Sequence, residues 1–190
     1  TDVVAFKFIS MFNRSNVESV WPGMDPLNLK VTQRGETEKF LLVPFTDICS
    51  PHKNFEFVVN NADSIFKDYE IIVTAAQLNH REYPKNIHFI GRIERSELFS
   101  LYKHAEFTLF PSLLETIGLP IFESLEFNTP VLCFNLEYIN DFVQKFNLSP
   151  YIFYLDNKIE LSGYNHIVNV KEHSYRKGEW EKIHNLLMEL

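Results

Sequence analysis

Two acidic side chains, Glu115 and Glu123, are separated by seven residues and flank the start of a predicted helix. Pro111 ends the apolar run before them, and Gly118 and Pro120 lie between them, where a proline suits the first turn of a helix. The free N–H groups of a helix start attract an anion, and a glycine lets a phosphate approach the backbone closely. The Glu123 carboxylate, further along the helix, can accept hydrogen bonds from two adjacent sugar hydroxyls. This spacing predicts a pocket for a phosphate group and a sugar.

The elements that must position these residues alternate between short apolar runs and segments with helical spacing. This alternation predicts an α/β fold, a Rossmann-like parallel sheet with helices on both faces. Open sheets of this kind bind ligands at the carboxyl ends of their strands, so the site is expected in the loops that follow strands. We expect strands at 40–44, 69–75, 87–90, 107–110, 131–134 and 151–155, and helices at 54–66, 96–104, 118–127, 137–146 and 179–190.

Both ends of the chain are less regular than its middle. Residues 3–12 are apolar enough for a strand or a packed segment, and residues 156–178 have no clear periodicity. We therefore divide the chain into a linker segment, 1–38, that leads into one domain, 39–190, which includes a closing C-terminal helix. The chain begins with Thr1 rather than Met, from which we expect a fragment or an engineered chain.

Two further local features are expected in the helices. Ser96 is a suitable N-cap for the helix at 96–104. Trp180 is expected to pack in the core, from the apolar face of the closing helix.

Composition argues against several classes of protein. A formal net charge of −7 argues against nucleic-acid binding, because phosphate backbones require clustered Lys and Arg. Cys49 and Cys133 form no CxxC pair, and the His residues have no metal-ligand spacing, so no metal site is expected. No stretch approaches the length of a membrane span, and the N-terminus has no signal-peptide pattern. We therefore expect a cytoplasmic globular protein.

A family resemblance begins with the run at 111–131, which reads PSLLETIGLPIFESLEFNTPV. Its two glutamates, with Pro-Ser before them, Gly-Leu-Pro between them and Thr-Pro-Val after them, resemble the hallmark of glycosyltransferase family four. This family, also called glycosyl transferases group 1, has the GT-B fold. Residues 89–106 resemble the stretch that precedes the motif, and Pro-His-Lys-Asn at 51–54 resembles the family's phosphate-binding loop. The resemblance covers about residues 20–190 and implies the C-terminal, nucleotide-sugar-binding half of a GT-B enzyme.

The resemblance also implies a role for each matching residue. Glu115 would contact the transferred sugar and is the candidate catalytic residue. Lys53 would bind the diphosphate of the donor, which suits a point charge on a flexible stem. Glu123 would bind the ribose hydroxyls. Further donor contacts, from the helix start, from the loop that faces the nucleobase and from the loop before the lysine, are expected at Thr116, Ile117, Gly118, Leu119, Arg92, Ile93 and His52.

The implied enzyme is a hexosyl-type glycosyltransferase of class EC 2.4. It would transfer a sugar with retention from a nucleotide-diphosphate sugar to a saccharide or lipid-linked acceptor, in cell-surface polysaccharide or lipopolysaccharide synthesis. The donor is a substrate, and neither a cofactor nor a metal is expected. An acceptor-binding domain would precede this half, and the fragment alone should be inactive because transfer needs both substrates held together. A peripheral position at the inner face of the membrane, through that missing half, is an alternative to a purely cytoplasmic one.

One departure from the family concerns the diphosphate. The family usually has Gly-Arg shortly before the lysine, but residues 44–53 read PFTDICSPHK and contain no arginine. Thr46 or His52 would have to substitute for it in part. Two alternatives therefore stay open: a non-catalytic module that binds nucleotide or protein, and a different enzyme on the same architecture, such as a nucleotide-sugar epimerase or a phosphorylase. Without the surrounding motif, the two glutamates would fit solvated helix-end carboxylates equally well.

Overall fold

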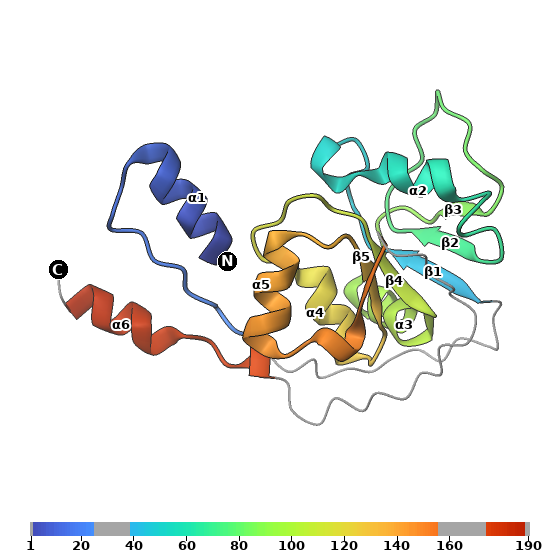
Figure 1. Cartoon of the computed structure of the whole chain (residues 1–190). Helices are drawn as coiled ribbons and strands as arrows, with labels where there is room; N and C mark the ends of the chain where they lie inside the picture. Colours follow the sequence, from blue (N-terminus) through green and yellow to red (C-terminus); the bar gives the residue numbers. More distant parts are fainter. Residues whose placement is uncertain (1, 25–38, 156–173, 189–190) are drawn as a thin grey trace.

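The computed structural model describes residues 2–24, 39–155 and 174–188, and a six-stranded parallel sheet forms its centre (Figure 1). The sheet order is β3-β2-β1-β4-β5-β6. The order changes direction between β1 and β4, and in doubly wound sheets the ligand crevice opens at this switch point. The strands are β1 (Phe40–Val43), β2 (Glu70–Val73), β3 (Ile87–Phe89), β4 (Phe107–Phe110), β5 (Val131–Cys133) and β6 (Ile152–Tyr154).

Helices lie between the strands and at both ends of the described chain. Two of them, α1 (Asp2–Phe12) and α6 (Trp180–Met188), lie on the same side of the sheet-bearing body (Figure 1). The others are α2 (Phe55–Asn61), α3 (Arg95–His104), α4 (Leu119–Glu126) and α5 (Glu137–Phe146), with short 3-10 helices η1 (Pro51–Lys53), η2 (Ser149–Tyr151) and η3 (Ser174–Arg176).

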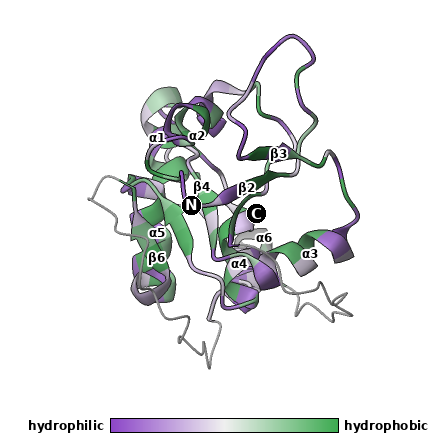
Figure 2. Ribbon diagram, turned by 90° about the vertical axis from the view of Figure 1, so that its right-hand side faces the viewer, coloured by the Kyte–Doolittle hydropathy of each residue, from purple (hydrophilic) through white to green (hydrophobic). Residues whose placement is uncertain are grey.

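The core lies on both faces of the sheet because successive strand residues point in opposite directions. Leu41 and Val43 of β1 belong to a large cluster that includes the buried residues of α2, α4 and α5. Phe40 and Leu42 belong to a second cluster with the buried hydrophobic residues of α3. Hydrophobic colouring runs along the central strands (Figure 2). The predicted fold class, a Rossmann-like parallel sheet with helices on both faces, is confirmed.

The chain enters and leaves the sheet-bearing body at one place. The indole N–H of Trp21 donates to the carbonyl oxygen of Tyr175 at 2.5 Å. The Trp21 carbonyl accepts from the Glu179 N–H at 2.8 Å, and the Trp21 N–H donates to the Glu179 carboxylate at 2.8 Å. The segments approach so closely that a Cβ on Gly23 would lie 2.6 Å from the backbone nitrogen of Gly178. We call these paired segments, residues 21–24 and 175–179, the clasp.

Residues 3–12, for which the sequence allowed a strand or a packed segment, are not a strand, because residues 2–12 form helix α1. Its sequence is rich in apolar and branched residues, but Phe8 and Phe12 follow helical spacing and their rings lie 4.5 Å apart. The helix buries none of its residues. The proposed domain boundary at 38/39 and most of the irregular stretch at 156–178 fall outside the described residues.

Two local predictions about helices are also wrong. The N-cap of α3 is Glu94 rather than Ser96, because Glu94 and Glu97 form a reciprocal capping box that includes a 3.0 Å bond from the Glu94 N–H. Trp180 is 60% exposed and therefore is not a core residue. The remaining helix and strand ranges between 40 and 155 agree with the expected ones to within a few residues, except that α2 ends at Asn61.

Candidate functional site

Lys53 and Glu115 come from two loops that the strand order brings together. Lys53 ends η1 after β1, and Glu115 lies in the loop at 111–118 after β4. β1 and β4 are adjacent and parallel, so both loops open at the same edge of the sheet, at the switch point. The Lys53 Nζ lies 2.5 Å from the Glu115 Oε1, and the two side chains are 23% and 14% exposed. The structure therefore joins two predicted site residues in one half-buried ion pair.

Backbone contacts hold the two loops together independently of this ion pair. The Leu113 N–H donates to the carbonyl oxygen of His52 at 2.7 Å. The side-chain amide of Asn54 donates to the carbonyl oxygen of Pro111 at 3.3 Å. These bonds lie on either side of Lys53 in the sequence, so its backbone position is set by its neighbours.

Gly118 shapes the start of α4. Its φ of 66° lies in the left-handed region that favours glycine. A Cβ would lie 3.3 Å from Ile121 Cδ1 and 3.3 Å from Phe142 Cε2, so the position also has little room. Pro120 has no N–H and the Ile121 N–H donates to the Gly118 carbonyl oxygen at 2.9 Å, so among the first three residues of α4 the N–H of Leu119 is the one left to face a ligand, at the positive end of the helix dipole. α5 braces the same loop, since the Tyr138 hydroxyl donates to the carbonyl oxygen of Ser112 at 2.6 Å.

Glu123 lies on the side of α4 that faces α3. The Tyr102 hydroxyl donates to its Oε2 at 3.2 Å, and Arg95 Nη2 lies 3.8 Å from its Oε1. Its side chain is 14% exposed, and this burial raises the pKa of Glu123, with Tyr102 and Arg95 opposing the shift. Glu115 and Glu123 thus pair with different basic residues, although α3 and α4 begin at the same edge of the sheet. Their predicted convergence on one donor molecule stays a prediction.

A buried chain of hydroxyl groups positions Glu123 through its neighbours. Thr108 of β4 and Ser124 of α4 are hydrogen-bonded at 2.6 Å, and Ser124 donates to the Thr129 carbonyl at 2.8 Å. The Thr129 hydroxyl donates to the Tyr102 carbonyl at 2.6 Å. Because buried polar groups must find partners, this chain fixes α4 against β4 and α3. From the sequence, Ser124 and Thr129 were recognised only as members of the family motif, and their hydrogen bonds were not predicted.

The loop before Lys53 folds around the side chain of Asp47. The Asp47 carboxylate accepts hydrogen bonds from the Ser50 hydroxyl and, at 2.8 Å, from the Cys49 N–H. These two bonds lower the pKa of Asp47. The Lys53 Nζ lies 5.3 Å from the centre of the Phe45 ring. This loop thus contributes the Lys53 ammonium group that contacts Glu115.

The remaining predicted donor contacts lie in the loops at the same edge. The side chains of His52, Thr116 and Leu119 are exposed, and that of Ile117 is half-buried. Arg92 is exposed after β3, whereas Ile93 is half-buried and packs against the cluster that contains α3. The roles of these seven residues, which include Gly118, stay predictions.

A pocket of about 480 Å³ opens beside Glu115, and α1 forms one of its walls. Sequence reasoning did not assign α1 to the site. The available signal was the i, i+4, i+7 spacing of Val4, Phe8 and Met11, which indicates one face of a helix. The pocket is lined by His52, Leu114, Glu115 and Thr116 from the loops and by Val4, Lys7, Phe8 and Met11 from α1.

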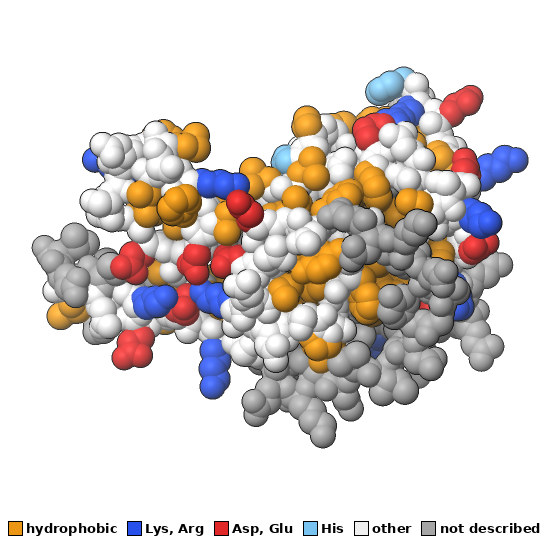
Figure 3. Space-filling model, in the orientation of Figure 1, with side chains coloured by type: hydrophobic (Ala, Val, Ile, Leu, Met, Phe, Trp, Pro, Cys, Tyr) orange, Lys and Arg blue, Asp and Glu red, His pale blue; other side chains and the backbone are white. Residues whose placement is uncertain are grey.

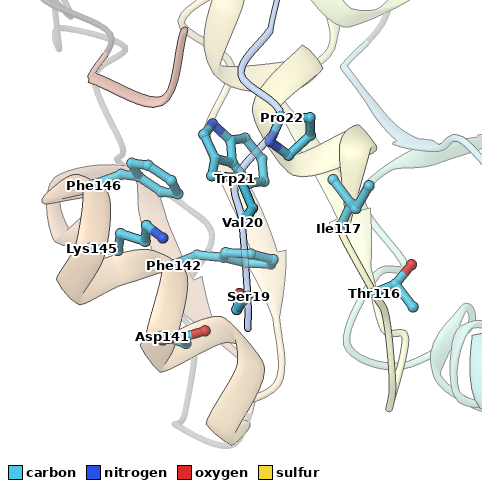
Figure 4. A pocket seen from close by; sticks show the side chains of 10 residues that line it. All are labelled: Ser19, Val20, Trp21, Pro22, Thr116, Ile117, Asp141, Phe142, Lys145 and Phe146. Atoms are coloured by element: carbon cyan, nitrogen blue, oxygen red, sulfur yellow. The ribbon is translucent and has the colours of Figure 1, made fainter. Parts of the chain in front are cut away.

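A smaller pocket of about 190 Å³ lies next to the same loop, between Thr116 and Ile117 on one side and α5 on the other. Figure 4 shows the segment at 19–22 running through the space between these two walls. The α5 wall consists of Asp141, Phe142, Lys145 and Phe146.

Within residues 2–24, 39–155 and 174–188, no cluster of His, Cys, Asp or Glu side chains is suited to hold a metal ion. In the same ranges, no helix has the length and apolar character needed to cross a membrane.

Comparison with known proteins gives a consistent family. Residues 33–157 match the family model for glycosyl transferases group 1. The α-monoglucosyldiacylglycerol synthase of Streptococcus pneumoniae is 30% identical over 103 residues, which cover 54% of this chain and 22% of that protein. The O-antigen chain mannosyltransferase RfbU of Salmonella typhimurium is 26% identical over 110 residues, which cover 53% of this chain and 31% of that protein. The chain thus spans less than a third of the length of these two relatives.

Solved structures agree at the level of the fold. The crystal structure of TarM matches with a TM-score of 0.62 at 16% identity and covers 83% of this chain and 33% of that one. A variant of S. aureus TarM in complex with fondaparinux, α-GlcNAc-glycerol and UDP matches with a TM-score of 0.60 at 15% identity, over 75% and 30% of the two chains. These likenesses support the Rossmann-like architecture of GT-B glycosyltransferases. Since the family model matches well over half of its residues, the chain belongs to the glycosyl transferases group 1.

Proposed function

We propose that this chain is the C-terminal, donor-binding part of a retaining hexosyltransferase of glycosyltransferase family four. It would act on a nucleotide-diphosphate sugar and a saccharide or lipid-linked acceptor. The observation that carries the proposal is the Lys53–Glu115 contact at the switch point, next to the helix start at Gly118. One cation, one carboxylate and the backbone N–H at the start of α4 thereby share the sheet edge where such folds bind nucleotides.

In the proposed reaction, the bond between C1 of the donor sugar and the β-phosphate oxygen breaks. The acceptor hydroxyl oxygen bonds to C1 on the same face, and its proton leaves with the nucleoside diphosphate. Lys53 and the Leu119 N–H at the start of α4 oppose the charge that gathers on the departing diphosphate, so the reaction uses neither a metal nor a cofactor. Glu115 accepts hydrogen bonds from the transferred sugar, and Glu123 accepts them from the ribose.

The names of two relatives support a saccharide or lipid-linked acceptor and a setting in cell-surface synthesis. One is named as a synthase of a glucosylated diacylglycerol and another as an O-antigen chain mannosyltransferase. We therefore place this protein in cell-surface polysaccharide or glycolipid synthesis, in the cytoplasm or at the inner face of the membrane. Because the chain spans 22% and 31% of these relatives, the acceptor-binding domain would come from the rest of the protein.

Isothermal titration of the chain with UDP and with GDP tests the donor site. Lys53→Ala and Glu123→Ala should each weaken binding of the preferred nucleotide about tenfold or more, because a hydrogen bond to a charged group contributes roughly 1.5–3 kcal/mol. Lys103→Ala and Glu82→Ala remove exposed charges elsewhere on the body and should leave the affinity unchanged. Unchanged affinity in both site variants would refute the assignment.

A further inference from the structure

The Glu123 carboxylate is partly buried where α4 packs against α3. Lys, Arg, Asp and Glu side chains are spread over the outer surface that Figure 3 shows. Glu123, by contrast, is 14% exposed, and its sequence neighbours Phe122 and Ser124 are fully buried. Burying a carboxylate is costly unless hydrogen bonds compensate for the lost water. The groups that surround Glu123 therefore decide what this carboxylate can do.

The two partners of Glu123 differ in how firmly they hold it. The Tyr102 side chain is fully buried, and its hydroxyl donates to the Glu123 Oε2 at 3.2 Å. Arg95 is 68% exposed, and its Nη2 lies 3.8 Å from the Oε1, which is beyond hydrogen-bond distance. The Arg95 guanidinium also lies 5.0 Å from the centre of the Phe99 ring, so it has a second contact of its own. Tyr102 is therefore the partner that orients the carboxylate.

Tyr102 is itself held in place before any ligand binds. Its carbonyl oxygen accepts a hydrogen bond from the Thr129 hydroxyl at 2.6 Å. Its ring lies within 5° of parallel to the ring of Phe127, with the two centres 6.2 Å apart. Burial and the nearby Glu123 raise the pKa of Tyr102 well above its ordinary value, so the hydroxyl keeps its proton and acts as the donor. The donor to the Oε2 is thus fixed in position and in protonation state.

The Glu123 Oε1 remains available to a ligand. A carboxylate offers about four positions for hydrogen-bond donors. Of the described residues, only Tyr102 lies within hydrogen-bond distance of this carboxylate, and it uses one position on the Oε2. The Oε1 lies on the side of Arg95, where α3 begins after β3 at the carboxyl edge of the sheet. With its Oε2 held inside, Glu123 presents the Oε1 towards that edge in one orientation.

We propose that Tyr102 is a positioning residue for Glu123, and that its hydroxyl sets the preference of this site for ribonucleotides over 2′-deoxyribonucleotides. A pair of adjacent ribose hydroxyls needs a carboxylate at a fixed angle, and 2′-deoxyribose lacks one hydroxyl of the pair. A carboxylate that is oriented in advance binds the pair without losing rotational freedom on binding. This inference rests on the proposed function, because it takes Glu123 as the residue that binds the ribose.

Isothermal titration of the chain with the preferred nucleotide of UDP and GDP, and with its 2′-deoxy form, measures this preference. The parent chain should bind the ribose form about tenfold or more tightly, as expected for a hydrogen bond to a charged group. Tyr102→Phe keeps the buried ring and removes the hydroxyl, and the preference should fall to about threefold or less. Glu123 keeps Arg95 and some contact with water, so this variant should fold. Partial unfolding would weaken both nucleotides equally and leave their ratio unchanged.

Tyr154→Phe is the matched control, because it also removes a half-buried hydroxyl, whose 3.0 Å hydrogen bond to Asn140 joins β6 to α5. Its ratio should equal that of the parent chain. An unchanged ratio in Tyr102→Phe would overturn the proposal. So would an equal fall in Arg95→Gln, which would make the exposed cation the orienting group. A parent chain that binds both forms equally would instead refute the assignment of Glu123 to the ribose in the proposed function, and this inference with it.

The pH dependence of the ratio gives a second readout, which a purely structural role of Tyr102 would not change. Glu123 must be ionised to accept both hydroxyls. Burial raises the pKa of Glu123, while Tyr102 and Arg95, which both face it from α3, oppose the rise. Without the hydroxyl this pKa should rise further, so acidification should abolish the ribose preference at a higher pH in Tyr102→Phe than in the parent chain. Titration of the diphosphate affects both nucleotides and cancels in the ratio. Coinciding pH profiles would contradict the proposal.

Discussion

At the scale of single residues, the Lys53 ammonium group already has an anionic partner without any ligand. The Glu115 oxygen that it contacts at 2.5 Å occupies one direction in which Lys53 could meet a phosphate oxygen. A donor must therefore either share Lys53 with Glu115 or draw it away. Both side chains are partly buried, which limits screening by water and strengthens the competition between Glu115 and a donor phosphate for Lys53.

Glu115→Gln should tighten UDP binding about two- to fivefold, because a partly exposed ion pair of this kind is worth up to about 1 kcal/mol. The same change should abolish sugar transfer by the full-length enzyme if Glu115 holds the transferred sugar. Titration with UDP and a transfer assay with radiolabelled donor measure the two effects. Weaker UDP binding in Glu115→Gln would show that the carboxylate orients Lys53 rather than competing for it.

At the scale of elements, the turn that leads into α4 combines two constraints on Gly118. Its left-handed backbone is strained for any residue with a Cβ, and Ile121 and Phe142 lie within 3.3 Å of where that Cβ would be. α4 carries both the proposed phosphate-binding N–H of Leu119 and Glu123. A change at Gly118 therefore affects stability and donor binding together.

Gly118→Ala should lower the free energy of unfolding by about 1–2 kcal/mol from backbone strain alone, and further through the side-chain contacts. Gly91→Ala is the matched control, since Gly91 has a φ of 71° but nothing within 4 Å of its added Cβ. Chemical denaturation of both variants isolates the contact with Ile121 and Phe142. An equal loss of unfolding free energy in the two variants would mean that Ile121 and Phe142 accommodate the new Cβ without a measurable cost.

The sequence predicted the body of the fold well because the sheet is buried on both faces. Its strands are short, mostly apolar runs, such as Phe107–Phe110, which are typical of a parallel sheet covered on both faces. Placing Lys53 and Glu115 at one edge followed from the parallel topology. The contact between them did not follow, because it depends on side-chain rotamers and on bonds such as that from Leu113 to His52. The α1 wall was missed because most residues of α1 are apolar, so the i, i+4, i+7 spacing of Val4, Phe8 and Met11 does not stand out from its neighbours.

At the scale of the whole molecule, the clasp joins α1 and α6 to the body. Glu179 receives hydrogen bonds there from the Trp21 N–H, the Lys145 Nζ at 3.0 Å and the Lys182 Nζ at 3.0 Å. Burial opposes its ionisation, but these groups outweigh it and hold the pKa of Glu179 at about 2. A carboxyl whose pKa is lowered by folding stabilises the folded state above its ordinary pKa and loses that effect as the pH falls.

Glu179→Gln should lower the free energy of unfolding at neutral pH by about 1 kcal/mol, because the ionised contacts are lost and the side chain is partly exposed. The difference from the parent chain should shrink as the pH falls from the ordinary 4.5 towards 2. Glu181→Gln, an exposed position on the same helix, is the control. Melting curves across this pH range measure the effect, and a constant difference would contradict the assigned pKa.

The clasp also determines how this unit can be combined with other proteins. Since Trp21 and Glu179 exchange backbone and side-chain hydrogen bonds, the two polypeptide connections to the sheet emerge next to each other. A unit with adjacent ends can be spliced into a surface loop of a host protein without stretching the host. Gly23 and Gly178 set the condition for such grafting, because any side chain at either position would force the two connections apart.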